Sequence, residues 1–143
     1  MLTRKRRIAI LAILAGFQLA LIGFRFLVVP DSAIRTFGLS PAITGHQLHG
    51  IIGLRDLWLG VLAVALAVLS EWRALALWLF LGVLVCWGDA LIVATSDGNT
   101  LAVAFHAVSG VYCLALGIAV WRLFVTRCSR EHDELSSANH PAG

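Results

Sequence analysis

The stretch LHGIIGLRDLWLGVLAVALAVLS, residues 48–70, is long and apolar, yet it carries Arg55 and Asp56 side by side. At a rise of about 1.5 Å per residue, about 20 apolar residues cross the roughly 30 Å hydrocarbon core of a bilayer. The stretch is therefore predicted to span a membrane. A charge inside the bilayer costs about 3 kcal/mol even on lenient scales, so this pair needs a structural or functional reason.

Three other stretches of the chain are also long and apolar enough to span a membrane. Of the 143 residues, 59% are hydrophobic and 13% are charged, which gives more apolar surface than one soluble core hides. We predict an all-α fold, an integral membrane antiparallel four-helix bundle in residues 1–127, and a disordered cytoplasmic tail at 128–143. The predicted spans are residues 8–29, 48–70, 74–95 and 101–125.

Basic residues indicate the orientation, because Lys and Arg stay on the cytoplasmic side. Four of them occupy residues 4–7, Arg73 separates the second and third spans, and Arg127 follows the fourth, whereas the opposite side has only Arg35 in its loops. Both termini are therefore predicted to be cytoplasmic in a multi-pass protein of the cell membrane. The net charge of +3 reflects this bias, so no nucleic-acid partner is expected.

Each predicted span contributes a polar residue to one layer in the external half of the membrane. The helical rise places Arg25, Asp56, Asp89 and His106 at roughly 6 to 12 Å from the external ends of their spans. Small residues, which let membrane helices approach closely, share the faces of three of these residues. The predicted inward stripes are His49, Gly53, Asp56 and Gly60; Gly82, Cys86 and Asp89; and His106, Gly110, Cys113 and Gly117.

The helical geometry also suggests how the charges pair. Adjacent residues point about 100° apart, so Arg55 and Asp56 are not expected to be each other's main partner. We predict instead that Arg55 forms an ion pair with Asp89 and that Arg25 forms one with Asp56.

Two segments resemble a known family. GLRDLWLGVLAV (53–64) and WGDALIVATSDGNTLAVAFH (87–106) are similar to small four-span membrane proteins of the domain-of-unknown-function family 4267, and PDSAIRTFGLSP (30–41) resembles that family's first loop. The resemblance implies the four-span fold and no specific activity, because the family has no established general activity. A looser likeness to DoxX-like four-helix membrane proteins rests on the number of spans. The matching residues are Arg55, Asp56, Gly60, Gly88, Asp89 and His106.

Asp56, Asp89 and His106 are the candidate catalytic residues. A carboxyl group in a poorly hydrated pocket can keep its proton near neutrality, and imidazole titrates in the same range. We therefore predict acid/base chemistry, such as isomerisation, cyclisation or epoxide opening, on a lipophilic small molecule that enters from membrane lipid. Binding of this substrate is assigned to three further residues, and no cofactor is expected because no nucleotide motif is present. These substrate-binding residues are Arg25, Arg55 and His49.

Two other functions remain open. The chain would be a structural or accessory membrane subunit if the buried charges were interhelical salt bridges, with a second copy or another membrane protein as its partner. A small-solute carrier is less favoured, because the polar layer does not continue into the cytoplasmic half.

Three further features give smaller predictions. The spacing of His46 and His49 suits a metal only if a carboxylate joins them, and no third ligand is close in sequence, so no metal site is predicted. The external loop at residues 30–47 has the pattern of a short amphipathic helix, either a lid over the polar layer or a plain connector. Trp72 and Trp87 match the positions of interfacial anchors.

Overall fold

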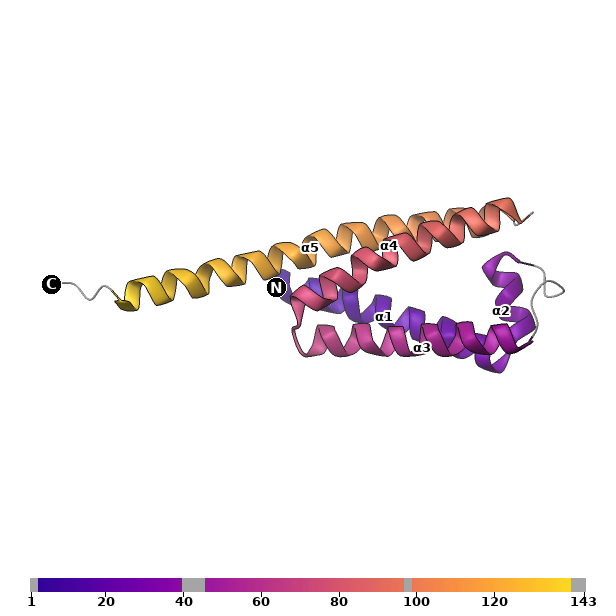
Figure 1. The fold of residues 1–143 in the computed structure, drawn as a ribbon, viewed down its shortest axis with the longest axis horizontal. Helices are drawn as coiled ribbons and strands as arrows, with labels where there is room; N and C mark the ends of the chain where they lie inside the picture. The colour runs from indigo at the N-terminus through magenta and orange to yellow at the C-terminus, as the bar shows by residue number, and fades with distance from the viewer. Residues whose placement is uncertain (1–2, 40–45, 97–98, 140–143) are drawn as a thin grey trace.

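The structure, a computed structural model, describes residues 3–39, 46–96 and 99–139, with side chains to residue 126 except that of His46. Its described elements are all helices, and four of them are long and apolar enough to cross a membrane. The predicted all-α, four-span fold is confirmed (Figure 1). The helices are α1 (Arg4–Val28), α2 (Pro30–Phe37), α3 (His46–Val68), α4 (Trp72–Thr95) and α5 (Thr100–Asn139).

Local sequence signals set the ends of the first two helices. The Thr3 hydroxyl caps α1 by accepting a hydrogen bond from the Arg6 amide at 3.4 Å. Pro30 begins α2, where its missing N–H leaves no donor unpaired. Gly38 ends α2 in the left-handed region at φ 104°, which costs other residues about 1–2 kcal/mol. The amides of Gly38 and Leu39 both donate to the Ile34 carbonyl at 3.1 Å, closing the last turn.

The four spans form two pairs, α1 with α3 and α4 with α5 (Figure 1). Glycines allow the backbones of α1 and α3 to touch. A Cβ added to Gly16 would lie 2.8 Å from the Gly60 carbonyl oxygen, and one added to Gly23 would lie 2.6 Å from the Gly53 carbonyl oxygen. Such backbone contact is the packing that small residues permit in membranes.

Glycines also mark the contact between α4 and α5, but there they lie beneath aromatic rings. The Trp87 indole covers Gly110, and the Phe80 ring lies 2.9 Å from a Cβ built on Gly117. Substitution of either glycine would therefore displace a ring, whereas in the α1/α3 pair it would displace backbone.

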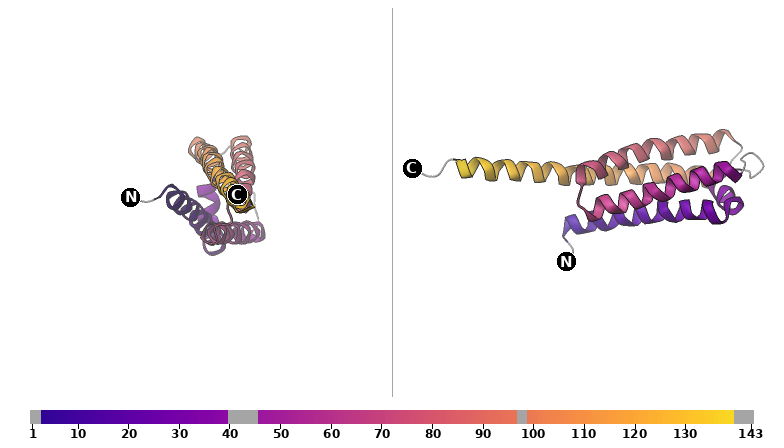
Figure 2. Two further views of the ribbon diagram at one scale, coloured as in Figure 1. Left: turned by 90° about the vertical axis from the view of Figure 1, so that its left-hand side faces the viewer. Right: turned by 60° about the horizontal axis from the view of Figure 1, so that its bottom comes forward.

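Two apolar clusters close the bundle at opposite ends, seen from two further sides in Figure 2. The first lies where α1 and α4 begin and α3 ends, and includes Ile8, Ala67, Trp72 and Val120 from all four spans. Trp72 is 4% exposed, so the prediction that it anchors the lipid interface is wrong. Its position at the first turn of α4 points it inward, beneath the start of α1.

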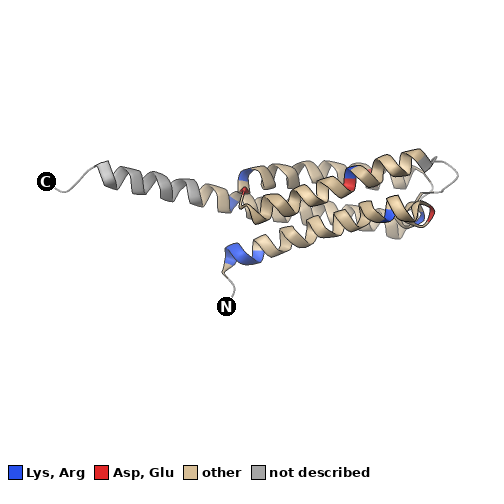
Figure 3. Ribbon diagram, turned by 90° about the horizontal axis from the view of Figure 1, so that it is seen from below, with Lys and Arg blue, Asp and Glu red and all other residues tan. Residues whose placement is uncertain are grey.

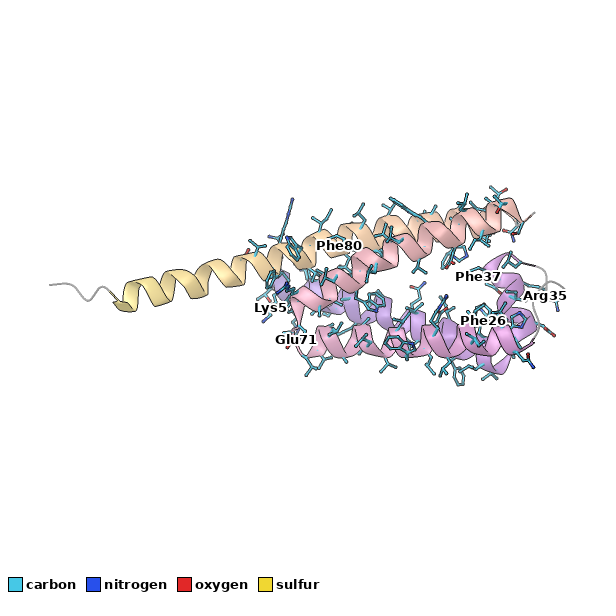
Figure 4. The ribbon with its side chains drawn as sticks, viewed as in Figure 1. Lys5, Phe26, Arg35, Phe37, Glu71 and Phe80 are labelled. Atoms are coloured by element: carbon cyan, nitrogen blue, oxygen red, sulfur yellow. The ribbon has the colours of Figure 1, made fainter. Side chains whose placement is uncertain are left out.

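The second cluster joins α2 to α1 and is centred on Phe26, Ala33 and Ile34. The Phe26 and Phe37 rings meet edge to face at a centroid distance of 6.1 Å, and Figure 4 shows both at this end of the bundle. The predicted short amphipathic helix in the external loop is thus present as α2. Residues 40–45 of that loop lie outside the described residues.

Basic residues gather where α1 and α4 begin, which we call the N-terminal end; the opposite end is the α2 end (Figure 3). That the N-terminal end faces the cytoplasm stays a prediction. The disordered cytoplasmic tail at residues 128–143 stays a prediction; among the described residues, α5 continues as a helix to Asn139. The physical reason is that neither Gly nor Pro occurs between Gly117 and Pro141 to stop it. The domain boundary at residue 127 stays a prediction.

Candidate functional site

Arg25 holds α2 in place. Its Nη2 donates to the Ser32 and Thr36 hydroxyl oxygens, each at 3.3 Å. The predicted pairing of Arg25 with Asp56 is therefore wrong. Near the end of α1, the long side chain reaches the polar face of the adjoining helix α2 instead, because only one residue separates the two helices.

Phe37, at the end of α2, covers His106 on α5. The two rings lie 4.4 Å apart between centroids, and His106 Nε2 lies 3.2 Å from the Phe37 carbonyl oxygen. Since a carbonyl oxygen only accepts hydrogen bonds, Nε2 carries the proton and Nδ1 of the neutral ring is free to accept one. The contact of Phe37 with His106 was not predicted; the only signal for it in the sequence is the amphipathic pattern of residues 30–39.

The glycine that ends α2 fits between α4 and α5. A Cβ added to Gly38 would lie 2.6 Å from the Ala102 Cβ and 2.8 Å from Val93 Cγ1. The end of α2 therefore contacts both spans next to His106, so that α2 bridges the two helix pairs over the polar layer.

Arg55 and Asp56 form an ion pair, with Nε and Oδ1 2.8 Å apart. The prediction that they are not partners, and that Arg55 pairs with Asp89, is wrong. Their Cβ atoms do point in different directions, but the three methylene groups of Arg55 let the guanidinium fold back toward its neighbour. Asp56 is 8% exposed and Arg55 46% exposed at the side chain, so a buried carboxylate is paired with a half-exposed cation.

Asp89 on α4 is half-buried and faces the same region from the other helix pair. It lies within electrostatic range of His106, Arg55 and Asp56. Among the side chains that the structure describes, none hydrogen-bonds to Asp89 or forms an ion pair with it. Asp56 and His106 are thus near enough to Asp89 for their charges to act on it, while the role of the three residues as one site stays a prediction; among the described side chains, Asp89 has no direct partner.

The predicted inward face of α3 is confirmed by burial. His49 is 1% exposed and Asp56 6% exposed, and Gly53 and Gly60 are buried with them. His49 packs near the Phe26 ring, at a centroid distance of 6.2 Å, so the apolar α2-end cluster adjoins it. The side chain of His46 lies outside the described residues, and the absence of a metal site stays a prediction.

Cys86 and Cys113 lie next to each other across the α4/α5 contact, one turn from Asp89 along α4. Their thiols lie within interaction range of each other, and Cys113 Sγ lies 3.7 Å from a Cβ built on Gly82. The charges of both Asp56 and Asp89 reach Cys86. The two predicted stripes on α4 and α5 therefore face each other at the edge of the polar layer.

We expect iodine, which partitions into the bilayer, to join Cys86 to Cys113 in a Cys128→Ser variant. The neighbouring thiols are expected to reach each other with little movement of the helices, and the two thiol hydrogens leave as hydrogen iodide. Intact-mass analysis after alkylation under denaturing conditions should show two fewer alkyl groups. Cys86→Ala in the same background is the control and should keep its single label. Full labelling of both thiols after iodine treatment would contradict the α4/α5 register.

The cavities described in the structure lie away from these charges. One, of about 320 Å³, is at the N-terminal end, and another, of about 520 Å³, lies between α1 and α3. Neither is lined by Asp56, Asp89 or His106. The predicted polar pocket therefore rests on the gathering of the charged residues and on the cover provided by α2.

The comparisons with known proteins give one result. Residues 16–120 match a family model described as "Domain of unknown function (DUF4267)". No curated protein and no solved structure matches the chain significantly. The match covers α2, α3 and α4 in full, the second half of α1 and about the first half of α5. It includes Arg25, Asp56, Asp89 and His106. The chain is thus a multi-pass membrane protein that belongs to the DUF4267 family.

Proposed function

We propose that the chain is a membrane-embedded enzyme that moves protons on a lipophilic small molecule, through isomerisation, cyclisation or epoxide opening. The observation that supports this most is Asp89, a half-buried carboxyl group within a span, beside His106 and without a direct partner among the described side chains. A carboxyl group held only by neighbouring charges is free to exchange a proton with a bound molecule.

The other polar residues take supporting roles in this proposal. His106 is the second proton-exchanging group, because its Nδ1 accepts a proton while Nε2 stays bonded to the Phe37 carbonyl oxygen. Asp56, also a predicted catalytic residue, is held in the ion pair with Arg55. In this proposal it sets the electrostatic potential around Asp89. Arg25 contributes by holding α2, and His49 by lining the face of α3 between α2 and Asp56.

A structural role is the second candidate, and the Arg55–Asp56 ion pair favours it. In that case the polar layer would hold the helix pairs together, within one chain or in an assembly with a second copy or another membrane protein. A solute carrier is favoured less, because the apolar cluster around Leu75 and Leu79 closes the N-terminal end of the bundle.

Hydrogen exchange into a bound molecule tests the proposal. Purified protein in nanodiscs is incubated in deuterated water with a lipophilic cell extract, and mass spectrometry detects molecules that gain deuterium on carbon. Asp89→Asn and His106→Gln are each expected to slow this exchange at least about 100-fold, the usual contribution of a general acid or base. Asp31→Asn, a change at an exposed carboxylate on α2, is the matched control.

Infrared difference spectra give an independent measurement. A carboxyl band that shifts on addition of the extract, and that disappears in Asp89→Asn but persists in Asp31→Asn, would support a substrate at Asp89. If no extract component gains deuterium on carbon, no epoxide in the extract is converted and no carboxyl band shifts, while Asp89→Asn only lowers stability, the enzymatic proposal is wrong and the structural role stands.

A further inference from the structure

A cavity of about 320 Å³ lies at the N-terminal end, between the start of α1 and the turn that joins α3 to α4. Its polar side is formed by two cations, Lys5 and Arg6, and by the hydroxyl-bearing residues Thr3 and Ser70. No acidic side chain is among the described residues that line it. Two cations without a lining carboxylate give the cavity a positive potential and favour an anionic ligand.

Trp72 positions one of these cations. The Lys5 ammonium lies 5.6 Å from the centroid of the Trp72 ring, within the range of a cation–π contact, and Trp72 itself is buried. Figure 4 labels Lys5 and Glu71 at this end of the bundle, but Glu71 is exposed and is not part of the lining. Lys5 is therefore held over the cavity by a fixed aromatic surface.

One side of the cavity is apolar and adjoins a groove. Ala9, Ile13, Ala67 and Val68 form its apolar side. Val68 also lines the cavity of about 520 Å³ between α1 and α3, so the two adjoin at this residue. All the residues around this second cavity are apolar: Phe17, Ala20, Val61, Val64, Ala65, Val68 and Leu69.

The groove matches one leaflet of a bilayer in length. Ala9, Ile13, Phe17 and Ala20 follow one another at helical spacing, so they form a single stripe along α1. The stripe is about 16 Å long at a rise of about 1.5 Å per residue, and half of the hydrocarbon core is about 15 Å thick. A cationic cavity at the end of the bundle thus adjoins an open apolar groove whose α1 stripe extends toward the middle of the membrane.

We propose that this groove is a binding site for an anionic phospholipid. The phosphate lies between Lys5 and Arg6, and an acyl chain follows the stripe from Ala9 to Ala20. A free phosphate ion would leave the apolar groove unused, and a zwitterionic lipid would bring its own cation to the basic cavity. Val68 is about 18 Å along α3 from Asp56, so the site is separate from the proposed acid/base site and does not depend on it.

Native mass spectrometry of the full chain, released from micelles with equimolar phosphatidylglycerol and phosphatidylcholine of equal chain length, tests this site. Wild type should retain phosphatidylglycerol preferentially. Lys5→Gln with Arg6→Gln should weaken its binding about 30-fold, the effect expected for two basic residues near a lipid phosphate. Arg73→Gln with Arg122→Gln removes the same charge without changing a lining residue, and should leave binding within about threefold of wild type.

The apolar half of the site has its own test. Val61 is 57% exposed, so Val61→Trp should fold while its ring fills the groove. It should displace long-chain phosphatidylglycerol but not the dihexanoyl form, and inorganic phosphate should compete weakly with the long-chain lipid. If both double variants lost phosphatidylglycerol binding equally, the lipid would be held only by the general positive charge of this end of the protein, and the proposal would be wrong. Displacement by phosphate alone would show an ion site, and equal retention of phosphatidylcholine would show no selectivity; either result also overturns it.

Discussion

Gly23→Leu is expected to separate α1 from α3 and to lower the free energy of unfolding by about 3 kcal/mol or more. A Cβ at this position would meet the Leu57 amide nitrogen and lie 2.6 Å from the Gly53 carbonyl oxygen. Because these atoms belong to the backbone of a packed helix, no side-chain rotation relieves the overlap. Unfolding in mixed micelles with increasing SDS, followed by tryptophan fluorescence, measures the change.

Gly88→Leu is the matched control for this prediction. The added Cβ would have nothing within 4 Å, and Gly88 lies on a span of similar apolar character. We expect the free energy of unfolding of this variant to stay within about 1 kcal/mol of wild type. Equal destabilisation by both leucines would mean that the glycines matter for helix insertion, and that the α1/α3 backbone contact does not carry the stability.

Arg55→Leu is expected to lower the free energy of unfolding by about 3 kcal/mol, because it leaves the carboxylate of Asp56 buried without its partner. The double variant Arg55→Leu with Asp56→Leu should recover most of this loss, since apolar residues replace the whole pair. The same SDS titration gives the coupling free energy from a double-mutant cycle.

An exposed arginine at the N-terminal end supplies the comparison. Arg73→Leu changes the net charge equally, and we expect it to alter the free energy of unfolding by no more than about 0.5 kcal/mol. If the double variant is as unstable as Arg55→Leu alone, Asp56 has a partner other than Arg55 in the folded protein. The ion pair would then not explain why this span carries two adjacent charges.

The spans were predictable from sequence because bilayer thickness fixes their length and composition. The inward face of α3 was also predictable, because the spacing of His49, Gly53 and Asp56 depends only on helical periodicity. That the charges of Asp56 and His106 act on Asp89 agrees with the similar depths of the three residues in their spans. These successes share one cause: each property is set by one helix and the membrane, without knowledge of its neighbours.

The pairings of the arginines were not predictable in this way. Arg25 and Arg55 have long flexible side chains, and the atoms that each reaches depend on the local path of the chain as much as on helical angle. Arg25 bonds to α2, whose close approach is set by Val29 and Pro30, and Arg55 folds back onto its sequence neighbour. The burial of Trp72 likewise depends on how α1 crosses α4, which hydropathy does not specify.

The pairing of α1 with α3 has a consequence for how the protein is made. The chain leaves the ribosome from its N-terminus, so α1 enters the membrane before the helix that fills its glycine notch at Gly16 and Gly23 exists. Its glycine face therefore contacts lipid while α2 and the following loop are synthesised. The helices α4 and α5, by contrast, follow one another directly and meet as soon as both are inserted. The first helix is therefore exposed to lipid and to other partners for longer than α4 or α5, until Gly53 and Gly60 of α3 pack against it.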